Sequence, residues 1–220
     1  MKHALAIFAK TPLPGKVKTR LSPPLTLRQC ADLYRCMLLD TVERTAALGV
    51  DTVLFYEGGE GFFEKVAPGA VLVHQSPGGL GVRLEHAFDE MARLGYASRV
   101  VIGSDSPDLP LRFIEEAFRV LERGEDAVFG PAEDGGYYLV GVKGAYGALF
   151  EGIPWSGDKV LEASLRQAKN SGLSAALLPP WHDIDSYGDL LLLDHASGAA
   201  RTGAFIAALG LAPSLAADAG

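Results

Sequence analysis

The chain has 220 residues, of which 27 are acidic and 20 are basic, so its formal net charge is −7. At roughly 150 residues per domain, this length predicts one sizeable domain with additions. A hydrophobic fraction of 48% supplies an ordinary core and excludes a disordered chain, a collagen-like chain and a small disulfide scaffold. The acidic balance argues against a nucleic-acid partner, and it requires any phosphate site to be a local basic patch.

The two cysteines, Cys30 and Cys36, fall within one predicted helix. Six residues at about 1.5 Å rise separate them by about 9 Å, beyond the roughly 7 Å that a disulfide can bridge. Free cysteines suit a reducing compartment. The apolar run at residues 4–9 is too short for a signal peptide, and no run of about 18 apolar residues occurs. We therefore expect a soluble, cytoplasmic protein without a membrane span, as a monomer or homodimer.

Short apolar segments alternate along the chain with amphipathic segments of helical period. In chain order, the first expected elements are a strand at Ala4–Ala9, a helix from an N-cap at Thr26 to about Leu48, strands at Thr52–Tyr56 and Ala70–His74, and a helix with Leu84, Ala87, Phe88 and Met91 on one face. A strand at Arg99–Gly103, a helix at Leu111–Leu121 and strands at Asp126–Gly130 and Tyr137–Val142 follow. The last expected elements are a helix from Ser156 to about Lys169, a strand at Ala175–Pro179, a terminal helix opened by Ser186 with Asp189 as its capping partner, and a short helix at Phe205–Leu211.

Apolar strands separated by helices predict an α/β fold, a mostly parallel Rossmann-like sheet covered by helices on both faces. We expect one domain over residues 1–197 and an Ala-rich, partly helical extension over residues 198–220, with Ala212–Gly220 loose. Ligands of such sheets bind beyond the carboxyl ends of the strands, at the point where strand order reverses. The loops after those ends are therefore the places to search.

The loop after the first strand is basic, with Lys10, Lys16, Lys18 and Arg20 within 11 residues. These cations, beside the amides of a glycine, could surround a phosphate chain. A solvated basic loop is an equal alternative. The glycine-rich loop from Gln75 to Arg83 allows close approach of a ligand, although a simple turn is the better explanation of the glycines alone. Arg83 has the wrong sign for a helix N-terminus, which points to a ligand acid or a partner acid.

Carboxylates follow two later segments. Asp105 stands at the end of a buried strand, where a hard oxygen ligand suits Mg²⁺ or Mn²⁺. We interpret Asp108 as the N-cap of the following helix. Asp183 and Asp185 alternate about Ile184, so an extended segment points both to one side and Ile184 inward. They either complete a divalent site or form an acidic loop, and the isolated His182 is more often structural than a ligand.

A further loop, Glu133 to Tyr138, carries two acids before two glycines. Either acid could serve as a general base, and an ordinary turn is equally consistent with the pattern.

Several of these motifs occur in the same order in one bacterial family. They are Pro14–Leu21, Gln75–Leu84, Gly103–Leu109, Asp134–Leu139, Trp155 and Ser156 with Asp158, and Asp183–Asp185. Over residues 2–193 the sequence resembles the DUF2064 group of glycosyltransferase-A-fold, or nucleotide-diphospho-sugar transferase-like, proteins. It is more distantly similar to guanylyltransferases of the 2-phospho-L-lactate and molybdenum-cofactor types. One departure is Gly79, where family members often carry an aspartate.

The resemblance implies a nucleotide-binding transferase. It places Lys18 and Arg20 at the phosphates and Asp105 and Asp185 as ligands of Mg²⁺ or Mn²⁺. If sugar transfer inverts the anomeric centre, a base is needed, and Asp134 is the candidate. The residues that the resemblance implies for nucleotide contact are Ala9, Lys10, Pro14, Gly15, Lys16, Thr19, Gly81, Arg83 and Ser104.

The first reading is transfer of a sugar from a nucleoside-diphosphate sugar to an unknown acceptor. The second is nucleotidyl transfer to a phosphorylated acceptor with release of pyrophosphate. The third is a non-catalytic nucleotide-binding protein.

Overall fold

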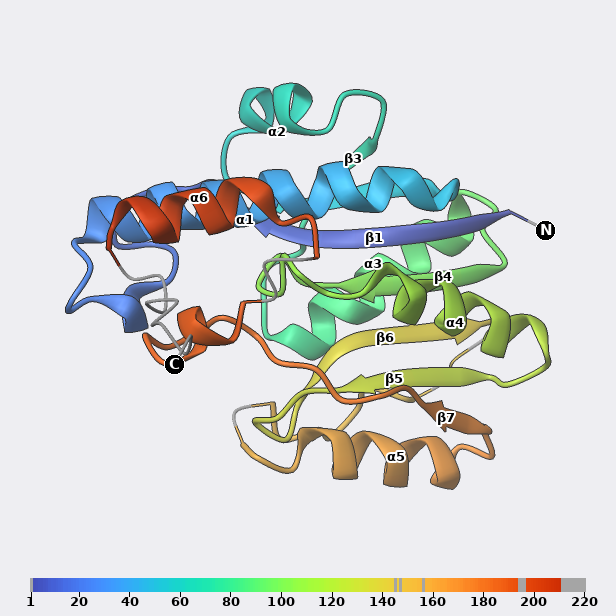
Figure 1. The fold of residues 1–220 in the computed structure, drawn as a ribbon. Helices are drawn as coiled ribbons and strands as arrows, with labels where there is room; N and C mark the ends of the chain where they lie inside the picture. The colour runs from blue at the N-terminus through green and yellow to red at the C-terminus, as the bar shows by residue number, and fades with distance from the viewer. Residues whose placement is uncertain (1, 145, 147, 156, 194–196, 211–220) are drawn as a thin grey trace, which may run out of the picture.

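The structure, a computed structural model, describes residues 2–144, 146, 148–155, 157–193 and 197–210. Within them, strands form one sheet in the order β3-β2-β1-β4-β6-β5-β7 (Figure 1). The strands are β1 (His3–Lys10), β2 (Asp51–Glu57), β3 (Val71–His74), β4 (Ser98–Ile102), β5 (Ala127–Pro131), β6 (Tyr137–Lys143) and β7 (Ala175–Leu177). The α-helices are α1 (Leu27–Thr45), α2 (Glu60–Val66), α3 (Leu80–Arg93), α4 (Leu111–Glu122), α5 (Val160–Asn170) and α6 (Ala200–Ala208).

The sheet is mostly parallel, as predicted. Strand β1 pairs in parallel with both β2 and β4, whereas β6 runs antiparallel to both β4 and β5. Strand order reverses beside β1, because β2 lies on one side of it and β4 on the other. The reversal of β6 brings its first residues to the edge of the sheet where β1 and β4 end.

Helices cover both faces of the sheet (Figure 1), and they bury alternate strand residues. On one face, Phe88 of α3 and Ala168 of α5 pack with Phe55 and Phe129. On the other face, residues of α4 such as Ile114 pack with the other strand positions, and Leu38 of α1 packs with Leu54. Burial on both faces explains why the strands are continuously apolar. No helix of the described residues combines the length and apolar character needed to cross a bilayer.

The N-terminal boundary of α1 agrees with the sequence. Thr26 is its N-cap, and a reciprocal capping box with Gln29 satisfies two backbone donors. Tyr34, Leu38 and Thr41, which are spaced three or four residues apart along one face of this helix, are buried. Cys30 and Cys36 within this helix are both free thiols, as expected.

Two features of the helices differ from expectation, and two further expectations fall partly outside the described residues. Helix α2 was not expected, because glycines surround its single buried anchor, Phe63. The described part of the fifth helix begins at Val160, and the expected start, Ser156, lies outside the described residues. Asp189 accepts from the Ser186 N–H, but it opens only a four-residue 3₁₀ turn, Asp189–Leu192. Residues 211–220, expected in part as helix end and loose tail, lie outside the described residues.

The last helix, α6, begins at Ala200, five residues before the expected start at Phe205. The reason is a cap supplied by another helix. Asp40 of α1 is 1% exposed, and its carboxylate accepts from the Thr202 N–H at 2.7 Å, the Thr202 hydroxyl at 2.7 Å and the Arg201 N–H at 3.2 Å. A carboxylate at a helix N-terminus satisfies orphan donors there. Helices α1 and α6 consequently lie side by side in Figure 1.

We predict that Asp40→Ala lowers the free energy of unfolding by about 2–3 kcal/mol, because it leaves buried donors of α6 unpaired. Urea denaturation measures this change. Glu43→Ala is the matched control, since Glu43 pairs with Arg201 from the same face of α1 but is 65% exposed; its loss should stay within about 1 kcal/mol. Equal losses for both variants would contradict the capping role of Asp40.

Candidate active site

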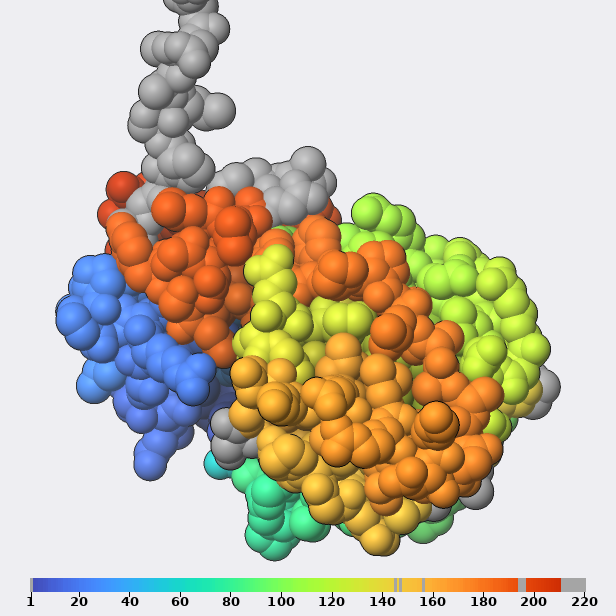
Figure 2. All heavy atoms as spheres, turned by 90° about the horizontal axis from the view of Figure 1, so that it is seen from below, coloured from blue at the N-terminus to red at the C-terminus, as the bar shows by residue number. Residues whose placement is uncertain are grey.

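A cavity of about 720 Å³ opens at the carboxyl ends of β1 and β4, where the strand order reverses. The rule for α/β sheets predicts a ligand site at this place. Its walls come from the loop after β1, the loop before α3, the loop after β4, the first residues of β6 and the segment around Asp183. In Figure 2, which views the molecule from below, a deep-orange segment that follows β7 in the chain lies between the blue N-terminal region and the yellow segment around β6.

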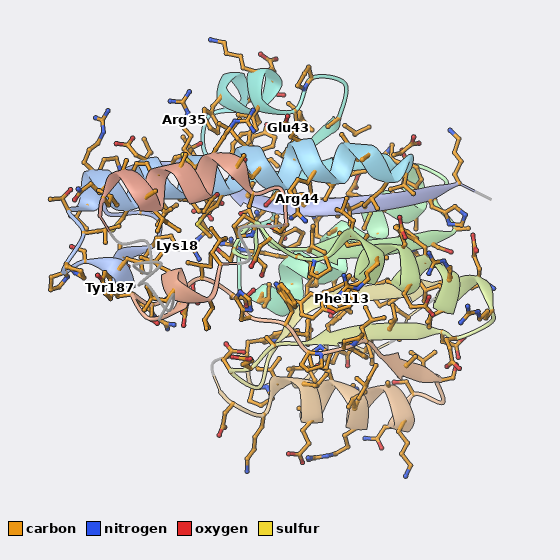
Figure 3. All side chains as sticks on the ribbon, in the orientation of Figure 1. Lys18, Arg35, Glu43, Arg44, Phe113 and Tyr187 are labelled. Carbon is orange, nitrogen blue, oxygen red and sulfur yellow. The ribbon has the colours of Figure 1, made fainter. Side chains whose placement is uncertain are left out.

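Lys18 occupies the centre of the charged part of this cavity. Its ammonium Nζ lies 2.6 Å from Asp105 Oδ1 and 2.8 Å from Asp185 Oδ1, and it donates to the Ile184 carbonyl at 2.5 Å. The Lys18 side chain is only 4% exposed. Figure 3 places it on the loop between β1 and α1, facing the segment that carries Tyr187. The sequence places Lys18 at a phosphate chain, and the structure pairs it with two carboxylates.

The charge of Lys18 is strongly stabilised. Burial alone lowers the pKa of an ammonium, but the charges of Asp105 and Asp185 outweigh burial, and the net pKa of Lys18 is raised. Lys18 has left-handed backbone angles, with φ of 48° and ψ of 37°. Such a conformation is costly for a residue with a side chain, so its surroundings hold it there. Arg20, two residues on, is 82% exposed, with Nη1 3.8 Å from Asp185.

The segment 183–185 is fixed by its central residue. Ile184 is fully buried, and its N–H donates to the Asp105 carbonyl at 2.9 Å. Asp183 therefore points to the Ser106 hydroxyl, which donates to it, and Asp185 points to Lys18. Burial raises the pKa of Asp183 to about 6, although the hydrogen bond from Ser106 opposes this shift.

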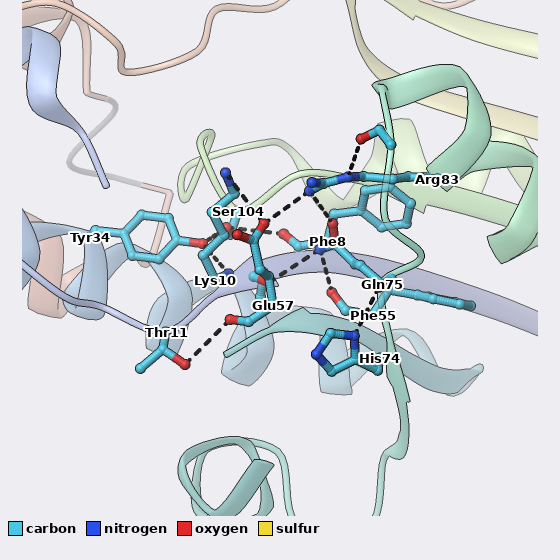
Figure 4. Close-up of polar contacts among 12 residues, drawn as sticks. Phe8, Lys10, Thr11, Tyr34, Phe55, Glu57, His74, Gln75, Arg83 and Ser104 are labelled. Atoms are coloured by element: carbon cyan, nitrogen blue, oxygen red, sulfur yellow. Dashed lines mark hydrogen bonds and ion pairs between the residues drawn. The ribbon is translucent and has the colours of Figure 1, made fainter. Parts of the chain in front are cut away.

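A buried tyrosine joins the ends of β1 and β4. The Tyr34 hydroxyl of α1 accepts from the Lys10 N–H at 2.9 Å and lies 2.8 Å from Ser104 Oγ. Ser104 in turn donates to the Phe8 carbonyl at 3.2 Å. Burial and the charge of Asp105 raise the pKa of Tyr34 to about 12, so its hydroxyl stays protonated. This network fixes the floor of the cavity (Figure 4).

Arg83 finds its acidic partner within the chain. Its guanidinium donates to Glu57 Oε2 at 3.0 Å and to Gln75 Oε1 at 2.9 Å, while Nε donates to the Gly78 carbonyl (Figure 4). Partial burial raises the pKa of Glu57, but the hydrogen bond from Arg83 and the charge of Lys10 outweigh it and lower the pKa. Gln75 is 7% exposed and bridges to the Phe55 carbonyl at 2.9 Å. The glycine loop is thereby tied to the ends of β1 and β2.

The structure brings most of the predicted site residues to this cavity. Those that line it are Ala9, Lys10, Lys16, Lys18, Thr19, Arg20, Arg83, Ser104, Asp105 and Asp185. Gln75, Tyr137 and Tyr138 also line it, and they belong to loops that the sequence marked without giving these residues a role. Tyr34 lines it as well and was no candidate from the sequence. The position of Tyr34 on a buried helix stripe gave no local signal of its contact with Ser104.

Four predicted residues do not line the cavity. Pro14 and Gly15 form an exposed turn before Lys16. Gly81 is buried in α3 against Trp155, where a Cβ atom would come within 2.6 Å of the indole nitrogen. Asp134 is exposed, and its carboxylate accepts from the Gly136 N–H at 2.9 Å, the pattern of an ordinary turn.

The interpretation of Asp108 as an N-cap is wrong. Helix α4 has Pro110 as its N-cap, without a side-chain hydrogen bond. Asp108 is fully buried, and its carboxylate lies 3.1 Å from His182 Nε2 and 3.4 Å from Trp181 Nε1. His182 and Trp181 lie more than 70 residues away in the sequence, so no local pattern reveals these two contacts. His182 is accordingly a structural partner of Asp108.

The arrangement of the sheet and helices is that of the nucleotide-diphospho-sugar transferase fold. The chain resembles the crystal structure of a "putative nucleotide-diphospho-sugar transferase" from Desulfovibrio desulfuricans G20, with a TM-score of 0.87 and 31% identity over 96% of each chain. It also shares its fold with CMP:2-keto-3-deoxy-manno-octonic acid synthetase complexed with CTP, at a TM-score of 0.55 and 13% identity over 86% of this chain and 95% of that chain.

The family described as "Uncharacterized protein conserved in bacteria (DUF2064)" matches residues 39–157, and the chain belongs to this family. A 2-phospho-L-lactate guanylyltransferase of Methanothrix thermoacetophila is 27% identical over 189 residues, which are 84% of this chain and 81% of the relative. These likenesses agree with the family resemblance seen in the sequence.

We predict that Tyr34→Phe lowers the free energy of unfolding by about 1–3 kcal/mol, because the Lys10 N–H loses its buried acceptor. Denaturant titration followed by circular dichroism measures the loss. Tyr187→Phe removes the same hydroxyl from a residue that is 40% exposed and should leave stability unchanged. A Tyr34→Phe variant as stable as the parent would show that this hydrogen bond does not fix the cavity floor.

Proposed function

We propose that the protein transfers a sugar from a nucleoside-diphosphate sugar to an acceptor, with help from a divalent cation. The observation that carries this proposal is the arrangement of Lys16, Arg20, Asp105 and Asp185 around one cavity at the reversal of the strand order. A diphosphate needs cations, and a divalent ion needs oxygen ligands beside those phosphates. The likeness to the Desulfovibrio structure supports the same reaction class.

The donor set fits Mg²⁺ or Mn²⁺. Asp105, Asp185 and the Ile184 carbonyl supply hard oxygen atoms around one point, the present position of Lys18 Nζ. No cluster of three or more acidic, His or Cys side chains that could hold a metal occurs in the described part of the chain. Two carboxylates are nevertheless what Mg²⁺ commonly takes from a protein, since phosphates and water complete its shell. When bound, the ion would neutralise charge on the diphosphate leaving group.

The chain's own residues would hold and orient the donor. Arg20 and Lys16 are exposed cations at the rim of the cavity, placed for the two phosphates. Asp105 and Asp185 are held in position by Ile184, whose backbone contacts both Asp105 and Lys18. Asp134 remains our prediction for a base, although its carboxylate is engaged in its own turn. Tyr137 and Tyr138 form a wall for the sugar or the acceptor.

Nucleotidyl transfer is the second candidate. It is favoured by the 27% identity to a 2-phospho-L-lactate guanylyltransferase across most of both chains. The same cations and carboxylates would serve, but the bond broken would lie at the α-phosphate and pyrophosphate would leave. Phosphorus NMR of reactions with nucleotide sugars and with nucleoside triphosphates separates the two, because a nucleoside diphosphate is the product in one and pyrophosphate in the other.

We predict that Arg20→Ala weakens nucleoside diphosphate binding roughly 10- to 100-fold, the effect of one charge-assisted hydrogen bond. Binding of the bare nucleoside should change little. Titration calorimetry with both ligands measures the difference. Arg35→Ala is the control, since Arg35 is an exposed arginine on the outer surface of α1 (Figure 3). Equal weakening of nucleoside and diphosphate would mean that Arg20 supports the structure and does not bind phosphate.

We predict that Asp105→Asn abolishes the strengthening of nucleotide binding by Mn²⁺ and preserves the fold. Thermal unfolding with nucleoside diphosphate, with and without Mn²⁺, is the measurement, because a ligand of the native state raises its stability. Asp134→Asn is the matched control and should keep the full metal effect. An unchanged metal effect in Asp105→Asn would remove Asp105 from the metal site.

A further inference from the structure

The ammonium of Lys18 stands where a divalent cation would have to bind. Three oxygen atoms, from Asp105, Asp185 and the Ile184 carbonyl, lie within 2.8 Å of Nζ. The carboxylates are 45% and 47% exposed, whereas the lysine side chain between them is 4% exposed. The lysine therefore fills the inner side of the group and leaves the outer side open to the cavity. We call these three oxygen donors the oxygen cage.

We propose that Lys18 is an internal cation that a divalent metal must displace, so that the lysine and the metal occupy the oxygen cage in turn. This inference rests on the proposed metal-assisted function. The two cations cannot share the cage, because an ammonium and a divalent ion at contact distance repel each other strongly in a partly buried site. The free protein should consequently bind metal weakly, since the lysine holds the cage in its resting state.

The surrounding loop allows the ammonium to move while its backbone stays in place. Val17 and Leu21 on either side of Lys18 are buried, which anchors the chain. The long side chain of Lys18 is flexible, and it lines the same cavity as Lys16 and Arg20. An incoming phosphate chain offers the displaced ammonium a new set of oxygen atoms there. Nucleotide and metal should therefore strengthen each other's binding by the same factor, as linkage requires.

The test is Mn²⁺ binding to the protein without nucleotide, followed by electron paramagnetic resonance of the free ion. Lys18→Met keeps a side chain of similar length, removes the charge and should raise Mn²⁺ affinity at least about tenfold over the parent. Lys16→Met is the matched control, because it removes one charge from the same loop outside the cage, and it should change the affinity little. Adding Asp105→Asn to Lys18→Met should abolish the gain.

An Mn²⁺ affinity of Lys18→Met equal to that of the parent would overturn the exchange. Should Lys18→Met fail to fold, the proposal is tested by the reactivity of Lys18 in the parent protein. Acetylation followed by mass spectrometry should show Lys18 protected in the free protein and reactive, several-fold faster, once saturating Mn²⁺ is added. The proposal would be contradicted if Lys18 stayed protected from acetylation at an Mn²⁺ concentration at which the ion binds the protein through Asp105.

These results are independent of whether a nucleotide sugar is the donor. Mn²⁺ binding by Lys18→Met needs no nucleotide, so it can succeed even if no nucleotide binds the protein. Conversely, nucleotide binding with an unaltered metal affinity in Lys18→Met would keep the proposed function and remove the exchange.

Discussion

Ile184 makes three interactions at one point, and the geometry of the charged site depends on them together. Its side chain is buried in a core with Leu21 of the β1–α1 loop and Ile206 of α6. Its N–H binds the loop after β4, and its carbonyl accepts from Lys18. Asp183 and Asp185, on either side of Ile184, line the cavity, whereas the Ile184 side chain is fully buried. A hydrophobic contact thus determines where two carboxylates stand.

The charges in the same region differ from the charge of the whole molecule. With a net charge of −7, the molecule as a whole repels anions. Lys16 and Arg20 are exposed cations at the rim of the cavity. Asp105 and Asp185 pair with Lys18, and Glu57 pairs with Arg83. Exposed cations therefore stand at the rim of the cavity, and the charged groups deeper in it are paired with one another. Such a division suits a ligand with a charged chain at one end and a neutral polar group at the other.

The sequence predicted the fold well because its signals are local. Apolar runs identify each strand, and Thr26 marks the start of α1. The rule that ligands bind beyond carboxyl strand ends selected the loops that the structure brings together. Long-range contacts leave no local pattern in the sequence and could not be predicted from it. Asp40 caps a helix about 160 residues away, Asp108 holds His182, and Tyr34 reaches Ser104 across the sheet edge. The pairing of Lys18 with Asp105 and Asp185 likewise depends on tertiary folding.

The reversed direction of β6 has a consequence for how such a protein can diversify. The β1–α1 loop and the glycine loop belong to the parallel half of the sheet, whereas Tyr137 and Tyr138 open a strand of the other half. The two walls of the cavity therefore share no strand and no connecting loop. Changes in the turn before β6 can reshape one wall while the other keeps its backbone. Selection can thus alter the ligand group that one wall recognises and preserve the group that the other wall recognises.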